Sequence, residues 1–257
     1  IPRSTVAEVY TSINSDLAQS YTLLDGKPRS NKSHFNSNVV RGLMARVALV
    51  QGKYPEAATY AKEARTGFAL MTNAQYKSGF NSYAVSEWMW GYSPIDLTSD
   101  YFGNFMAYMS RNYNSTQIRQ APKVVNNLLY NKFPATDVRT QVIDPTGAHT
   151  SLSLPSTYAK FPYTSQKFLC VNATGTVDNN TSLGDIPFMR SAEMYLIEAE
   201  ALARNNQEAE SKVVFDLLEK NRNPAYTSTT ATGAAYIEKI LDSRRLELWG
   251  EGFRFLD

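Results

Sequence analysis

Apolar residues recur at steps of three and four along both ends of the chain, which is the spacing of one helix face. In the first such stretch Val6, Val9, Ile13 and Leu17 fall on one side. The same pattern predicts helices over residues 4–25, 38–51, 55–66, 117–133, 189–204, 207–222 and 234–252. Only a short turn containing glycine and proline separates the second and third helices, so this pair must be antiparallel.

The middle of the chain lacks this periodicity. Aromatic residues crowd residues 67–116, where Trp88 and Trp90 lie two positions apart, a spacing that favours an extended segment. Residues 134–186 are rich in Ser, Thr, Asn, Gly and Pro and contain strand-like pieces such as 167–171. The sequence therefore predicts an all-α fold of tetratricopeptide-like helical pairs with a loop-rich, aromatic-rich insertion and minor β structure.

The amino-acid composition narrows the classes of function to be expected of this chain. Of 257 residues, 26 are basic and 24 acidic, and this balance gives no reason to expect a nucleic-acid partner. A single cysteine, Cys170, and two distant histidines make nucleophilic, general-base or metal chemistry a poor expectation, and no cofactor is predicted. Sixteen tyrosines favour stacking on a ligand. No apolar run approaches the ~20 residues of a membrane span.

Charged residues gather in two late segments, 190–201 and 243–257. Arg190 and Glu193 are one helical turn apart and could pair, and Glu200 lies among alanines, where a carboxylate needs a partner. The second segment offers such partners: Arg244, Arg245, Glu247, Glu251 and Arg254. We expect a partly buried ionic network that joins two helices; the alternative is a carboxylate pair for acid–base chemistry. Glu87 should pair with a buried basic group.

These two segments resemble the signature motifs of the SusD/RagB family. The closing motif can be matched at Arg245, Glu247, Leu248, Glu251, Gly252, Arg254 and Asp257, whereas Ser243 stands where a glutamate is expected. Segments 13–18, 45–57, 137–139 and 221–224 are similar to the family as well, in the same order. The resemblance implies an extracellular, outer-membrane lipoprotein of Bacteroidota-type bacteria, which sits over a SusC-like TonB-dependent transporter and captures nutrients, most often glycans.

The resemblance also implies a single SusD-like domain over residues 1–257. Within it, 1–66 and 117–133 would be helical scaffold, 67–116 the aromatic ligand-facing region, 134–186 irregular loops and 187–257 the C-terminal helices. Family members are about twice as long, so both ends are expected to be cut. A membrane would then be reached only through a lipid anchor outside this chain.

Ligand-binding residues vary within the family, so they are predicted from chemistry. Sugars present C–H faces that stack on aromatic rings and hydroxyls that need planar polar partners. The candidates are Trp88, Trp90, Tyr92, Asp96, Tyr101, Arg111, Asn112 and Tyr113. The alternative for each aromatic residue is a place in the core.

The function predicted from the sequence is non-catalytic capture of a glycan and its delivery to the transporter. The main alternative is a module that binds a peptide or another protein on its helical surface, with the aromatic residues in the core. A glycoside hydrolase would need a carboxylate pair, for which Asp96 and Asp100 are the candidates, although we expect these two residues to cap helices instead.

Overall fold

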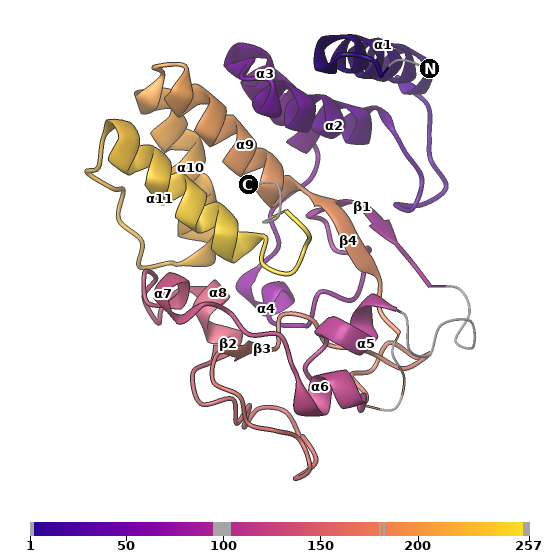
Figure 1. Cartoon of the computed structure of the whole chain (residues 1–257), viewed down its shortest axis with the longest axis vertical. Helices are drawn as coiled ribbons and strands as arrows, with labels where there is room; N and C mark the ends of the chain where they lie inside the picture. The colour runs from indigo at the N-terminus through magenta and orange to yellow at the C-terminus, as the bar shows by residue number, and fades with distance from the viewer. Residues whose placement is uncertain (1–2, 95–103, 180, 182, 254–257) are drawn as a thin grey trace.

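The computed structural model describes residues 3–94, 104–179, 181 and 183–253, and these are mostly helical (Figure 1). The long helices are α1 (Val6–Leu24), α2 (Ser37–Val50), α3 (Tyr54–Arg65), α9 (Ser191–Arg204), α10 (Glu208–Arg222) and α11 (Gly233–Glu247). Shorter helices are α4 (Asn73–Tyr76), α5 (Phe105–Met109), α6 (Thr116–Gln120), α7 (Asn127–Tyr130) and α8 (Val138–Gln141). The strands are β1 (Trp88–Tyr92), β2 (Ile143–Asp144), β3 (Thr164–Ser165) and β4 (Ile186–Arg190). The predicted all-α class with minor β structure is confirmed.

The long helices form one half of the molecule, and the short helices with their long loops form the other (Figure 1). The antiparallel pair β1–β4 lies between them, and β4 runs directly into α9. The segment around residues 87–92 is extended, as its alternating tryptophans predict. The helix predicted from residue 189 begins at Ser191 instead, because residues up to Arg190 belong to the strand.

Alanine faces allow α2, α3 and α9 to pack closely. Ala57, Ala61 and Ala64 on α3 are buried, together with Ala45 on α2 and Ala201 on α9. Small side chains let the axes of neighbouring helices approach one another closely, so α2, α3 and α9 pack tightly. The antiparallel pairing of α2 and α3 predicted from the short turn is confirmed.

Helix α1 forms as predicted, and its start is well specified. Thr5 accepts a hydrogen bond from the Glu8 amide, and the Glu8 carboxylate accepts one from the Thr5 amide, which is a capping box. None of the residues of α1, all of which the structure describes, is buried. The helix lies on α2, where the Arg41 guanidinium is 3.6 Å from the centroid of the Tyr21 ring.

The predicted helix over 117–133 is wrong, because the structure has α6 and α7 with a break between them. Pro122 cannot donate a helical hydrogen bond, and the residue before a proline avoids helical geometry. The chain after it is extended: Val124 bridges to Thr164, and the Val125 amide donates to the carbonyl of Tyr163.

The last predicted helix also ends earlier than residue 252. Its final residue is Glu247, after which Gly250 has a φ of +79°, in the left-handed region that favours glycine. A Cβ at this position would lie 2.7 Å from the ring of Phe168, so close packing excludes a side chain as well. The strand-like segment 167–171 is not a strand: within it, Val171 alone forms isolated bridges in the described chain.

A buried ionic network joins the two halves, and Arg190 is at its centre. Its guanidinium donates to Glu87, to Glu247 at 2.9 Å and to Glu251 at 2.7 and 2.9 Å. Arg222 donates to Glu87 at 2.8 and 2.9 Å and to Glu247 at 3.0 Å. All these side chains are essentially inaccessible to solvent. The prediction that Glu87 pairs with a buried base is confirmed.

Arg139 extends the network into the other half of the molecule. It binds Asp137 at 2.7 and 2.9 Å and Glu219 at 2.7 and 2.9 Å, and it donates to the hydroxyl of Ser243 at 2.8 Å. Ser243 in turn donates to Glu219. The residue that departs from the family motif therefore has a defined place in the network.

Lys167 closes the network at its other end. Its ammonium lies 2.6 Å from Glu251 and donates to the carbonyl oxygens of Glu247 and Trp249. Burial lowers the pKa of this amine from its ordinary value, although Glu251 opposes the shift. For the Glu247 carboxyl, burial acts in the opposite direction and would raise the pKa. The guanidinium groups of Arg222 and Arg190 overcome that effect and hold the pKa of Glu247 well below its usual range.

The predicted ionic network exists, but two of its pairings differ from expectation. Arg190 does not pair with Glu193, because Arg190 precedes the first turn of α9 with extended backbone angles and helical spacing does not apply to it. Glu193 binds Arg46 instead, at 2.7 Å. Glu200 binds Arg204 one turn along its own helix rather than the C-terminal segment. Arg254 lies outside the described residues.

Replacing Arg190 with methionine should lower the free energy of unfolding by about 3–5 kcal/mol, because three carboxylates would lose a buried partner. The matched control is Arg245→Met on α11, whose pairs with Glu238 and Asp242 are more exposed and should contribute at most about 1 kcal/mol. Urea unfolding followed by circular dichroism measures both. Equal losses in the two variants would contradict the network's role.

Acid should weaken the fold in a defined range. The lowered pKa values of Glu247 and Glu251 mean that these groups stabilise the fold fully above the unfolded-state pKa of about 4.3. That contribution is lost as the pH falls from there toward the lower folded-state values. Urea midpoints measured from about pH 7 to about pH 3 should drop below about pH 4; a constant midpoint would contradict this assignment.

Candidate functional site

The sheet formed by β1 and β4 separates two tryptophans that the sequence places close together. Trp88 pairs with Arg190 and Trp90 pairs with Met189, so the register shifts between them as in a β-bulge. A bulge changes which way side chains point. Trp88 is 1% exposed and packs in the core near Phe80, whereas Trp90 is only partly buried.

Trp90 lies between two exposed phenylalanines. Its ring centroid is 4.8 Å from that of Phe35 and 4.9 Å from that of Phe188, at tilted angles. Phe35 is 46% exposed and Phe188 is 41% exposed. We call these three rings the Trp90 surface. Exposed aromatic groups of this kind favour a ligand with apolar faces.

The loop before α2 is tied to β1, and this places Phe35 against Trp90. The guanidinium of Arg29 donates to the carbonyl of Met89 at 2.7 Å, and the Lys32 ammonium donates to that of Val85 at 2.6 Å. The carbonyl of Lys32 accepts from the Gly91 amide. The Trp90 surface is therefore built from segments that are held together by hydrogen bonds.

A cavity of about 420 Å³ adjoins the Trp90 surface. Its lining includes Trp90, Phe188, Arg46, Val50 and Phe253. This volume is within the range of small-molecule sites. The cavity gives a ligand on the Trp90 surface both apolar and polar neighbours.

Arg46 fixes the geometry of this cavity. It binds Glu193 with two bonds of 2.7 Å, donates to the carbonyl of Phe188 at 2.6 Å, and lies 4.9 Å from the ring centroid of Phe253. Burial lowers the pKa of Arg46, but the Glu193 carboxylate more than compensates and raises it. The strand that carries Phe188 is thus attached to α2 by a charged side chain.

Of the predicted ligand residues, Trp90 and Tyr92 lie where a ligand could reach them. Tyr92, at the end of β1, is 49% exposed. Asp96 and Tyr101 lie outside the described residues, as does Asp100. Trp88 is in the core, which is the alternative stated for each aromatic residue.

Arg111, Asn112 and Tyr113 are brought together, but in the interior near α5 and α6 and not beside Trp90. The Asn112 amide donates to the carbonyls of Cys170 and Asp178 and accepts from the Cys170 amide, so its hydrogen-bonding capacity is used by the fold. Arg111 donates to the carbonyl of Ala159 at 2.8 Å, and burial lowers its pKa. A ligand role for these three residues stays a prediction.

Sequence reasoning missed Phe35 and Phe188. Phe188 lies in β4, which was assigned in part to the following helix, and Phe35 lies in a loop with no periodic pattern. The residues of β4, Ile186–Arg190, do not alternate between apolar and polar, so periodicity offers no signal for an exposed Phe188. Nothing local marks Phe35, because its position depends on contacts with β1.

The described part of the chain holds no group of three or more His, Cys, Asp or Glu side chains suited to a metal ion. Within the same residues, no helix combines the length and the apolar character needed to cross a membrane. The arrangement at the Trp90 surface supports binding, since aromatic rings and a guanidinium adjoin a cavity there.

Comparisons with known proteins agree with this architecture. A sequence model of the SusD family matches residues 11–257. No curated protein sequence matches the chain. Among solved structures, a SusD-like carbohydrate binding protein from Bacteroides vulgatus ATCC 8482 is 27% identical, with a TM-score of 0.80 over 98% of this chain and 51% of that one.

Two further structures are similar. A putative sugar binding protein from the same organism is 28% identical, with a TM-score of 0.72 over 97% of this chain and 52% of that one. A laminarin binding SusD-like protein shares the fold, with 22% identity and a TM-score of 0.72 over 98% of this chain and 60% of that one. The chain spans between 51% and 60% of the length of these structures. Because the family model covers almost all of its residues, the chain belongs to the SusD family.

Proposed function

We propose that this protein captures a glycan outside the bacterial cell without chemically changing it. The observation that carries the proposal is the position of Trp90 between Phe35 and Phe188, with a cavity beside the three rings. Apolar faces of sugar rings stack on aromatic side chains, and Arg46 contributes a polar part to the lining of the cavity. The carbohydrate-binding and sugar-binding names of two similar structures support the same ligand class.

The ion pairs and the lowered pKa values of the buried carboxylates support binding without catalysis. Glu87, Glu247 and Glu251 are bound by arginine or lysine and are inaccessible to solvent. A glycosidase needs one carboxyl group kept protonated near neutral pH. The surroundings of Glu247 and Glu251 lower their pKa values instead, so these groups serve the fold.

Family membership supports the remaining parts of the proposal. The protein would act at the extracellular face of the outer membrane, held by a lipid anchor. It would pass its glycan to a SusC-like TonB-dependent transporter. A peptide ligand on the same surface is the competing outcome.

Phe188→Ala and Trp90→Ala should each weaken glycan binding about two- to tenfold, which corresponds to the roughly 0.5–1.5 kcal/mol of an aromatic contact. The measurement is a glycan array followed by titration calorimetry on the glycan that binds. Phe161→Ala is the matched control, since Phe161 is 39% exposed but lies on the long loops. Loss of binding in the control alone would move the site to those loops.

Tryptophan fluorescence gives an independent measurement. Trp88 is buried and Trp249 packs against the core beside Phe168, so a sugar bound at the Trp90 surface should change mainly the emission of Trp90. The variant Trp90→Phe should keep binding, because it retains a ring, but should lose most of this change. An unchanged response in that variant would contradict stacking at the Trp90 surface, and binding of peptides in place of glycans would overturn the proposed ligand class.

A further inference from the structure

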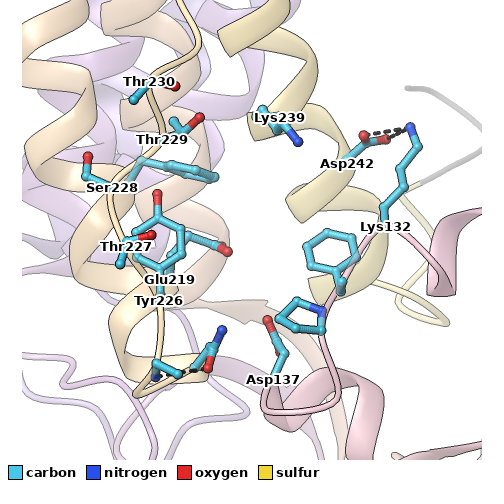
Figure 2. Close-up of a pocket in the computed structure, with 15 residues that line it drawn as sticks. Lys132, Asp137, Glu219, Tyr226, Thr227, Ser228, Thr229, Thr230, Lys239 and Asp242 are labelled. Atoms are coloured by element: carbon cyan, nitrogen blue, oxygen red, sulfur yellow. Dashed lines mark hydrogen bonds and ion pairs between the residues drawn. The ribbon is translucent and has the colours of Figure 1, made fainter.

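A second cavity, of about 480 Å³, lies on another part of the molecule (Figure 2). One wall is the connection between α10 and α11, and the other is formed by α11 together with the segment around Lys132 and Pro134. None of its lining residues belongs to the Trp90 surface. The cavity therefore needs its own explanation.

Its first wall carries hydroxyl groups that the protein itself does not use. Thr227, Ser228 and Thr230 line the cavity, and their hydroxyls make no hydrogen bond with residues that the structure describes. Figure 2 shows these side chains along a single stretch of backbone that borders the gap. Hydroxyls both donate and accept, so they suit a ligand that is itself rich in hydroxyls.

Aromatic rings line the same cavity. Tyr226 and Phe133 contribute rings to it, next to the hydroxyl wall. The Tyr226 hydroxyl donates to Asp216 at 3.0 Å, which fixes the orientation of the ring. Rings beside hydroxyls are the combination that recognises a sugar, with C–H groups on the ring and hydroxyls on the polar wall.

The hydroxyl wall is pre-formed. The Ala225 amide donates to the side chain of Asn223 at 3.0 Å, and the Gly233 amide donates to Glu208 at 2.7 Å. The first bond forms a turn directly after α10, and the second attaches the far end of the connection to the first residue of α10. A ligand would therefore lose little free energy to ordering this segment.

Among the described residues that line the cavity, all but one of the charged side chains have an ion pair. Asp137 and Glu219 are both bound by Arg139, and Asp242 is bound by Lys132 at 2.6 Å and by Arg245 at 2.8 Å.

Lys239 differs from these groups. Its side chain lines the cavity, is exposed, and has no ion pair among the residues that the structure describes. Figure 2 shows it on α11, across the gap from the hydroxyl wall. An ammonium group in this position favours a ligand that carries a negative charge.

We propose that this cavity is a second glycan subsite that selects a sugar residue bearing a carboxylate, a uronate. Lys239 pairs with the carboxylate, Thr227, Ser228 and Thr230 bind the hydroxyls, and Tyr226 packs against the ring. The inference rests on the proposed function, since it specifies which class of glycan a protein of this kind retains.

The test uses trimers of galacturonate, glucuronate and mannuronate, each compared with its carboxyl-reduced neutral form by titration calorimetry. The wild-type protein should bind at least one uronate trimer more tightly than its neutral form. Lys239→Met should weaken that binding about five- to tenfold and leave binding of neutral glycans unchanged. Lys62→Met, which removes a charge from the exposed side of α3, is the matched control and should have no effect.

A second variant, Thr227→Ala combined with Thr230→Val, tests the hydroxyl wall without altering charge and should also weaken uronate binding. Circular dichroism shows whether each variant is folded. The inference is overturned if no uronate trimer is preferred to its neutral form, or if Lys239→Met binds it as the wild type does. In both cases, the proposed function would stand if the wild-type protein binds a neutral glycan and Trp90→Ala binds that glycan more weakly. Absence of binding to every glycan would overturn the proposed function instead.

Discussion

The cost of burying charge is the constraint on which this structure depends. Arg190 and Arg222 are removed from water, and each is tolerable only because carboxylates from other segments surround it. The strand that ends at Arg190 and the helices that carry Arg222 and Glu247 must therefore meet in one geometry. Apolar packing alone would accept several arrangements, since alanine and leucine faces are interchangeable within limits. The charges select one of them.

The same strand connects this interior to the candidate ligand surface. β4 contributes Arg190 to the network and, two residues earlier, Phe188 to the Trp90 surface. Arg46 and Glu193 hold that part of the strand against α2 and α9. The aromatic rings therefore rest on a rigid support, which suits recognition of sugars, whose individual contacts are weak. Scaffold and ligand surface remain chemically distinct, because the charges of the network are buried and the rings are exposed.

Much of the scaffold could be predicted because its elements are determined locally. Helices such as α2 and α3 follow from apolar periodicity and a glycine–proline turn, and the buried partner of Glu87 follows from the cost of an unpaired carboxylate. The predictions that failed have a common cause, because contacts with distant segments determine the structure of those parts of the chain. Val124 and Val125 are apolar at helical spacing but pair with the chain around Thr164. The bulge after Trp88 and the loop that brings Phe35 to Trp90 depend on contacts between distant segments, which periodicity does not encode.

The sequence distances within the network have a consequence for how the protein folds. The bonds from Arg190 to Glu87 and Glu247 span 103 and 57 residues, and that from Arg222 to Glu87 spans 135. Arg190 and Arg222 cannot be neutralised by neighbouring residues in their own segments, so both stay hydrated until remote parts of the chain arrive. Contacts of such long range slow folding and make the late steps cooperative. A chain leaving the ribosome would hold its charges in water until the last of these segments, around Glu251, had been synthesised.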